Sequence, residues 1–360
     1  MSSCANQEIV ELLTSPIYLA LSYLQQMTSL GTLVLTGPAI YLLLRKSPFH
    51  YSTKILLFLS IFFANSFSLV LFSIQTTASY RAYKYGAEPC SLLFDTEECH
   101  FQVFFLVFSS YGLLTTPIAM SLERLLSTIA PKFYEQNGAW PSTFLTTFTN
   151  RPETSGALPM SQNRKSAGSH PGVLYVWLLT HFVMSPRVPV EFVASCAVPP
   201  TPMMKTLNFI ATIKTVAMIL CIFINIMILM YNRRTEKDIQ FDLKTQFRQR
   251  EALLTSQVTC TISIVLFFGF GIHTMTQLFV SFNPDLFSLT AANYTIKGFY
   301  TLPYAAMATP GLLLYGLRYI KRKRRRMIKE LTEAQETMRS RMKDLSILWD
   351  STYEQKYSQP

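Results

Sequence analysis

The residues with the most evident chemistry are a carboxylate and a guanidinium, Glu123 and Arg124, which directly follow the apolar stretch 101–122. Arg124 can pair with its neighbour Glu123 or reach across to another helix. The balance between two such arrangements is the kind of difference that a ligand can bias. The same two residues also fit an ordinary ion pair at a membrane interface. The pattern therefore predicts either a two-state switch or a structural ion pair.

A second polar group interrupts apolar sequence at Lys214, about eight residues into the stretch 206–231. Ionisable residues in such stretches are functional candidates. In a helical bundle, His273 and Gln277 are candidate neighbours that would form a polar spot in an aromatic pocket. The alternative is that Lys214 extends to the lipid headgroups. The candidate ligand pocket adds two aromatic residues to these three, Phe108 and Tyr300.

Composition indicates which elements must position these residues. Apolar residues make up 49% of the 360, charged residues only 15%, against about 25% in soluble proteins, and mean hydropathy is +0.24. A hydrocarbon layer about 30 Å thick needs roughly 20 helical residues. Six windows are that long and leave no polar stripe, which excludes a soluble helix face. They predict membrane-spanning helices at 21–44, 55–76, 101–122, 206–231, 254–282 and 298–317.

A seventh span is predicted at 172–185, although these 14 residues are short for a full crossing. The distribution of charge requires it. Seven spans place three of the connecting segments and the tail on one side of the membrane, in such a way that the charges separate. Of the 32 basic residues, 26 lie in the four segments on that side and five lie in the segments on the other side. The positive-inside rule makes the richer side cytoplasmic, so the N-terminus is expected outside and the C-terminus inside. The cytoplasmic segments are then 45–54, 123–171, 232–253 and 318–360.

Four cysteines fall in the outer segments, where disulfides persist. Cys99 precedes the third span and Cys196 lies in the second outer loop, so a bridge would tie the top of that helix to the loop above the bundle. This pair is the preferred disulfide, with Cys4–Cys90 as the remainder, although four cysteines allow three pairings and some can stay free. The sequon at Asn293 also falls outside and is either a glycosylation site or a chance occurrence.

Two features follow in the last span and the tail. Pro303 and Pro310 predict a hinge in the seventh helix, or simple packing. The run 321–326, together with Arg318, predicts contact with anionic lipid of the inner leaflet. Leu331, Met338 and Leu345 recur every seven residues, which indicates an amphipathic helix that lies on the membrane or on a partner.

Several classes of function lack support. The net charge of +11 is an asymmetry across a membrane, and does not indicate a nucleic-acid surface. There is no nucleotide-binding loop, no zinc-type Cys/His spacing, no catalytic triad and no acidic ring within the spans. We therefore expect neither an enzyme nor an ion pump, and no metal or cofactor.

The chain resembles the nematode serpentine receptor class alpha (Sra) chemoreceptors along most of its length. Taken together, the matching motifs are specific. They are Cys4…Glu8…Leu13-Thr14-Ser15, the stretch 49–57, Glu98-Cys99-His100, the stretch 123–128, Tyr134-Glu135, the stretch 246–253, Phe299-Tyr300-Thr301-Leu302-Pro303, and Trp349.

This resemblance implies an all-α, seven-helix G-protein-coupled chemosensory receptor of the plasma membrane, in sensory neurons or their cilia. A small molecule would bind among the outer halves of the helices and separate the cytoplasmic ends of helices three, five and six. Arg124, the loop 232–253 with Arg248 and Arg250, and the basic tail would then contact a heterotrimeric G protein. A ligand-gated channel or transporter with seven spans is the alternative.

One segment departs from the family pattern. Residues 137–171 are polar and contain four prolines, where the family passes almost directly into a full fourth span. The composition resembles translated non-coding sequence, so we expect a retained intron or a mispredicted exon boundary between Gln136 and about Gly172. If the chain is expressed as written, it would be a poorly delivered or non-signalling product.

Overall fold

The structure is a computed structural model of the chain. It describes residues 7–46, 49, 51–86, 88–129, 192–193, 196, 201–238, 243–283 and 286–357. The chain divides into two compact units, Met1–Leu314 and Tyr315–Pro360.

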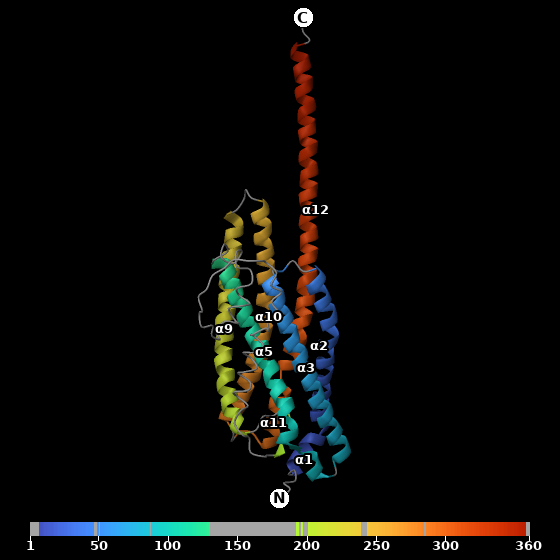
Figure 1. The fold of residues 1–360 in the computed structure, drawn as a ribbon, viewed down its shortest axis with the longest axis vertical. Coiled ribbons are helices and arrows are strands. Elements are labelled where there is room, and N and C mark those ends of the chain that lie inside the picture. The colour runs from blue at the N-terminus through green and yellow to red at the C-terminus, as the bar shows by residue number, and fades with distance from the viewer. Residues whose placement is uncertain are drawn as a thin grey trace, which may run out of the picture. The chain divides into compact units, whose positions relative to one another are not determined.

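The first unit is built from long helices (Figure 1). Short elements connect them or flank them: α1 (Gln7–Thr14), α4 (Pro89–Leu92), β1 (Phe94–Asp95), β2 (Phe192–Val193) and α11 (Leu289–Gly298). The long helices are α2 (Pro16–Lys46), α3 (Tyr51–Tyr85), α5 (Thr96–Ile129), α9 (Thr201–Asp238) and α10 (Leu243–Phe282), and α12 (Leu302–Tyr357) begins in this unit and continues through the second.

Five helices are long and apolar enough to cross a membrane. Their apolar residues surround the helix axis and leave no polar stripe, as expected when lipid replaces water. Within the described residues, these candidate spans are Pro16–Arg45, Ser52–Tyr85, Glu97–Ile129, Thr215–Arg234 and Ser256–Phe282. They coincide with five of the windows that the sequence predicts. The predicted fourth span at 172–185 and the insert 137–171 lie outside the described residues.

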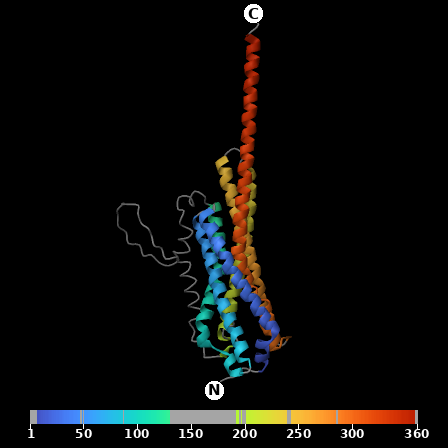
Figure 2. The same ribbon diagram turned by 90° about the vertical axis from the view of Figure 1, so that its right-hand side faces the viewer.

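The long helices run side by side in the bundle (Figures 1 and 2). Helix α3 packs between α2 and α5, and α9 packs against both α5 and α10. Their inner surface contains fully buried Phe63, Phe67 and Leu71, whereas Leu69 and Phe223 are more than 60% exposed. Large apolar side chains on the outer surface fit a bundle whose surroundings are lipid.

Small residues let the helices approach closely, which is typical of helix packing in membranes. Gly112 on α5 lies against the ring of Phe63 on α3, and a Cβ at position 112 would be only 2.1 Å from a ring carbon. Gly269 on α10 lies against Ala305 on α12 in the same way, with a Cβ 2.5 Å away. Several buried serines, such as Ser29, occupy similar interior positions.

The last helix of the bundle begins later than the sequence predicts. Helix α11 ends at Gly298, residues 299–301 form a turn, and α12 starts at Leu302 instead of 298. The turn is closed by backbone bonds from Phe299 to Thr295 and from Tyr300 to Lys297. Thr301 then donates its hydroxyl to the Gly269 carbonyl at 2.5 Å. The start of α12 is therefore fixed by α10 and by α11.

The second unit continues α12 as one helix from Tyr315 to Tyr357. Its basic run 321–326 is exposed, and so are Met338, Met342 and Leu345 on the apolar side. The contact of this segment with the membrane or with a partner stays a prediction.

Candidate functional sites

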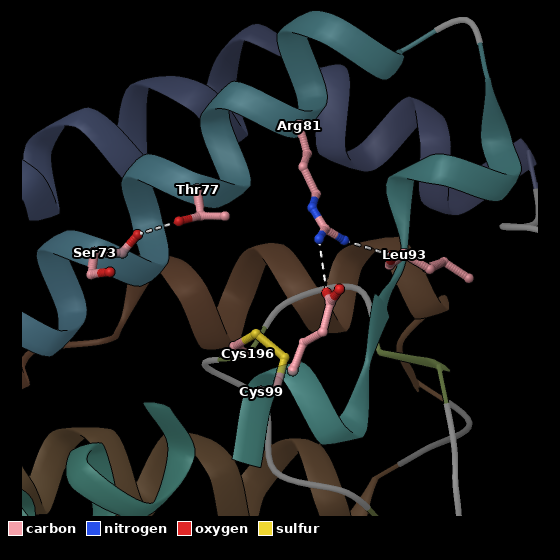
Figure 3. The surroundings of a disulfide bond; sticks show 7 residues. Ser73, Thr77, Arg81, Leu93, Cys99 and Cys196 are labelled. Carbon is pink, nitrogen blue, oxygen red and sulfur yellow. Dashed lines mark hydrogen bonds and ion pairs between the residues drawn. A yellow bond between two sulfur atoms is a disulfide. The ribbon is translucent and has the colours of Figure 1, made fainter. Parts of the chain in front are cut away.

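One end of the first unit, here named the disulfide end, is tied together by a bridge between Cys99 and Cys196 (Figure 3). The two Cα atoms lie 5.0 Å apart, and 97 positions separate the residues in sequence. A two-stranded pairing lies beside the bridge, with Phe94 opposite Val193 and Asp95 opposite Phe192. The start of α5 is thus joined to a segment that comes almost 100 residues later.

Arg81 on α3 holds the same region from the other side (Figure 3). Its guanidinium forms an ion pair with Glu98 at 2.8 Å and donates a second hydrogen bond to the Leu93 carbonyl at 3.0 Å. It also lies over the Phe94 ring, 4.1 Å from the ring centroid. One arginine therefore fixes β1 and the first turn of α5 to the end of α3.

The predicted pocket is partly assembled near the disulfide end. The His273 ring on α10 meets the Tyr300 ring edge-on, with the centroids 4.8 Å apart. Tyr300 in turn lies against Phe67 on α3, at 6.4 Å. His273 is buried, and its Nδ1 atom has no hydrogen-bond partner within the described part of the chain. A buried imidazole with an unused nitrogen is able to bind a polar group of a ligand.

Phe108 belongs to a neighbouring part of the same interior. Its ring meets that of Phe63 at 5.4 Å, and Phe63 lies one helical turn before Phe67 on α3. Gln277 follows His273 by one turn of α10 and is half-buried. Lys214 lies on α9, but its side chain is outside the described part of the structure. Two of the five predicted pocket residues, Tyr300 and Phe108, thus contact aromatic rings of α3, and His273 contacts Tyr300.

At the opposite end of the bundle, Glu123 and Arg124 join a third residue that the sequence analysis did not identify. Thr53 at the start of α3 donates its hydroxyl to Glu123 Oε1 at 2.8 Å, and it accepts a hydrogen bond from Arg124 Nη2. Arg124 Nε lies 3.2 Å from Glu123 Oε2. All three side chains are buried. The two charges balance each other, and Thr53 links them to α3.

A further hydrogen bond connects the same region of α5 to α9. Asn225 donates its side-chain amide to the Ser121 hydroxyl at 2.7 Å, and both residues are buried. Ser121 lies two residues before Glu123. Helix α5 is therefore joined by buried polar contacts to α3 through Glu123 and to α9 through Ser121.

The remaining predicted site residues stay predictions. Arg248 and Arg250 lie in the first turns of α10, and their side chains are outside the described part of the structure. Asn293 lies within α11 and is half-buried. Cys90 is disulfide-bonded, whereas Cys4 lies outside the described residues.

Of the two predicted hinge prolines, only Pro310 lies inside its helix. Pro303 is the second residue of α12. A proline in the first turn replaces an N–H that has no helical partner, so Pro303 interrupts no helical hydrogen bond. Pro38 in α2 and Pro117 in α5 also lie inside helices, and the sequence analysis did not single them out.

Lys297 near the end of α11 was counted in the sequence only as one outer charge, yet it has a defined setting. Its Nζ donates to Ser22 Oγ at 2.5 Å and lies 3.2 Å from the centroid of the Tyr18 ring. Its carbonyl accepts hydrogen bonds from the side chain of Gln25 and the backbone of Tyr300. Burial lowers the pKa of Lys297 to about 7. A single lysine gives no sequence pattern from which this setting could be inferred.

No site suited to a metal ion occurs in the described ranges, since they contain no group of three or more His, Cys, Asp and Glu side chains. The bundle therefore offers a buried aromatic and imidazole cluster near one end and a buried ion-pair cluster near the other.

The fold and these clusters define a helical, multi-pass membrane protein of the receptor type. The sequence matches the family described as "Serpentine type 7TM GPCR chemoreceptor Sra" over residues 1–150 and 179–349. The chain belongs to this family, which confirms the resemblance and the predicted seven-helix, all-α membrane class. The match leaves 151–178 uncovered, a stretch that overlaps the predicted insert.

Relatives in this family align with nearly the whole chain. Serpentine receptor class alpha-10 of Caenorhabditis elegans is 27% identical over 352 residues, which is 97% of each chain. Its namesake in Caenorhabditis briggsae is 25% identical, over 97% of this chain and 98% of its own. Serpentine receptor class alpha-11 of C. elegans is 26% identical, over 96% of this chain and 98% of its own. The protein is thus a chemoreceptor of the seven-helix class.

Proposed function

We propose that this receptor binds a small-molecule cue at the disulfide end and signals through a heterotrimeric G protein at the Arg124 end. The buried Thr53–Glu123–Arg124 cluster carries the proposal. A buried arginine is stable only while its charge is paired and its hydrogen bonds are made. Opening the cluster would release a charged group at the end of α5, where a partner can bind it.

The orientation that the proposal requires places the disulfide end outside the cell. The excess of basic residues in the segments at the Arg124 end supports it, and so does the disulfide, because such bonds form in oxidising compartments. The exposed run 321–326 would then lie beside the anionic inner leaflet. We place the receptor in the plasma membrane of a chemosensory neuron or its cilium, as the family suggests.

The cue would bind among Phe67, Tyr300, His273 and the adjoining Phe108. Aromatic rings favour an apolar or aromatic ligand, and the unused Nδ1 of His273 favours one that carries a single polar group. Binding would change how Tyr300, which His273 of α10 contacts, lies against Phe67 of α3, and α3 carries Thr53 at its other end. The ligand thereby acts on the cluster through a helix that both sites share.

The test is a cue screen in reporter cells that express the full chain together with a G protein. A panel of volatile and soluble compounds is applied while the G-protein reporter and the whole-cell current are recorded together. The proposal expects a reporter response that depends on the receptor and disappears without the G protein. A cue-evoked current in cells that lack the G protein would instead favour a channel.

The predicted insert bears on whether the protein reaches the surface. Sequencing the transcript across 137–171 decides whether this segment belongs to the expressed receptor. Removal of the segment from the message would mean that the working receptor lacks it. A continuous message would make the chain as printed the one to test, and surface labelling would then measure its delivery.

A further inference from the structure

Lys297 is a cation in a confined setting that the proposed function does not use. Its ammonium nitrogen contacts the Ser22 hydroxyl at 2.5 Å and the face of the Tyr18 ring at 3.2 Å. Within the described ranges, no carboxylate forms an ion pair with it. Among the described residues, its charge is balanced by a hydroxyl dipole and by the negative face of an aromatic ring.

The surroundings of Lys297 contain few groups that could stabilise or compete for its proton. Helix α11 packs against α1, α2 and α10. Tyr18 on α2 contacts the ammonium directly, and Tyr294 on α11 itself donates its hydroxyl to Ser15. On the other two helices, the titratable groups described at this end of the bundle are the exposed Glu8 and Glu11 of α1 and the buried His273 of α10. The charged residues Lys244, Arg248, Arg250 and Glu251 belong to the first turns of α10, at its other end.

The backbone of Lys297 is part of the turn that positions Tyr300. Its carbonyl accepts the Tyr300 N–H at 3.3 Å and the Gln25 side-chain amide at 3.2 Å. Gln25 in turn accepts a hydrogen bond from Gln75 on α3 at 2.7 Å. One residue therefore joins α11 to α2 through its side chain and sets the position of Tyr300 through its carbonyl.

We propose that Lys297 is a proton-binding site whose occupancy sets the packing of α11 against α2 and, through the turn at 299–301, the position of Tyr300. The effect on ligand binding rests on the proposed role of Tyr300 in the pocket. The protonated amine carries a partly desolvated charge between α11 and α2. The neutral amine keeps its contact with Ser22 but is no longer attracted to the Tyr18 ring. It also no longer carries the free-energy cost of burying a charge.

The direction of the pH effect follows from the balance of bound protons. The pKa of Lys297 lies at about 7 in the fold, below the ordinary value of 10.5. Between these two values the unfolded chain holds the proton and the folded chain releases it, so stability rises with pH across this window. Below pH 7 both states are protonated, and the contribution of Lys297 no longer changes.

The experiment measures thermal unfolding of the full-length receptor in detergent at pH 6 and pH 8.5, with a thiol-reactive dye that reports exposure of the buried Cys221 and Cys260. The wild type should gain a few degrees in Tm at the higher pH. Lys297→Met, which is neutral at both pH values, should lose most of this gain. Lys297→Arg stays charged and should unfold below the wild type at pH 8.5.

A matched control and a second readout keep the result interpretable. Lys84→Met removes an exposed lysine of α3 and should leave the pH dependence of the wild type intact. Hydrogen exchange of the segment 289–302, divided by the rates of an unstructured peptide of the same sequence, should show weaker protection at pH 6 in the wild type and no such change in Lys297→Met.

The proposal would be overturned if the Tm of Lys297→Met depended on pH as strongly as that of the wild type. It would also be overturned if Lys297→Arg had the Tm of the wild type at pH 8.5. If Lys297→Met does not fold, the wild type alone decides. Protection of its segment 289–302 that is the same at pH 6 and pH 8.5 would then overturn the proposal. Neither readout involves a cue or a G protein. Failure of this proposal thus leaves the proposed receptor function standing, and failure of signalling leaves the proton site standing.

Discussion

The hydroxyl of Thr53 donates a hydrogen bond of 2.8 Å to Glu123 Oε1 and thereby joins the first turn of α3 to the last turns of α5. The same hydroxyl oxygen accepts a bond from Arg124. Thr53 thus links both charged residues of this cluster to a second helix. Its removal separates the proposed switch from the helix that carries Phe67, which lies in the proposed pocket.

Replacement of this hydroxyl should shift the receptor toward its signalling state. Thr53→Val keeps the shape of the side chain but leaves Glu123 and Arg124 without their partner on α3. Hydrogen bonds to charged groups contribute about 1.5–3 kcal/mol, and 1.4 kcal/mol is a factor of ten. We expect basal reporter activity to rise about tenfold or more at equal surface expression. Thr53→Ser retains the hydroxyl and is the control; equal basal activity in both variants would argue against a switch.

The contact between Gly112 and Phe63 predicts a packing defect. Gly112→Ala places a Cβ within 2.1–2.3 Å of three ring carbons of Phe63, so the ring or the helix must move. Such overpacking costs about 1–3 kcal/mol. We expect a lower Tm in the thiol-dye assay. Gly37→Ala, which meets no atom within 4 Å, should leave Tm unchanged or raise it slightly, and a similar drop in both variants would contradict the packing.

The bridge between Cys99 and Cys196 should be needed for stability and surface delivery. Loss of a native disulfide typically costs about 2–5 kcal/mol, and this one closes a segment of 97 residues. Cys99→Ser and Cys196→Ser should each lower surface expression, and the double variant should add little to either one. Cys260→Ala, at a free buried thiol, is the control. Peptide mapping without reductant should recover the bridge, and its absence would refute the assignment.

His273 should contribute to cue recognition through its unused nitrogen. His273→Phe preserves a ring against Tyr300 but removes Nδ1. One neutral hydrogen bond contributes about 0.5–1.5 kcal/mol, so the concentration of the active cue at half-maximal response should rise up to about tenfold. Met275→Leu, on the exposed face of α10, should not shift it. An unchanged response in His273→Phe would place the cue elsewhere.

The apolar windows predicted the long helices because the membrane imposes a length and a composition that are local properties of sequence. Five windows coincide with helices that satisfy those limits. The start of α12 was predicted four residues too early, since apolarity continues through 299–301. The turn there depends on bonds to Thr295, Lys297 and Gly269, and bonds to a distant residue leave no local pattern.

Among the candidate site residues, those with a local sequence pattern were predicted, and those that depend on distant contacts were missed. Glu123 and Arg124 were evident because two opposite charges follow an apolar stretch, and Cys99–Cys196 was favoured by the position of both residues on one side. Thr53 was missed because a threonine at the start of a helix is common, and its role depends on a residue 70 positions away. Lys297 was missed as well, since its contacts lie on α2 at a sequence separation of 275.

The central claim is that Arg124 transmits the signal of a bound cue to a G protein. The most direct measurement compares wild type and Arg124→Ala in cells matched for surface expression, using the strongest cue of the panel, with reporter output and binding of the labelled cue recorded in parallel. The account predicts that reporter output is lost while cue binding is retained. Full reporter output from Arg124→Ala would contradict it.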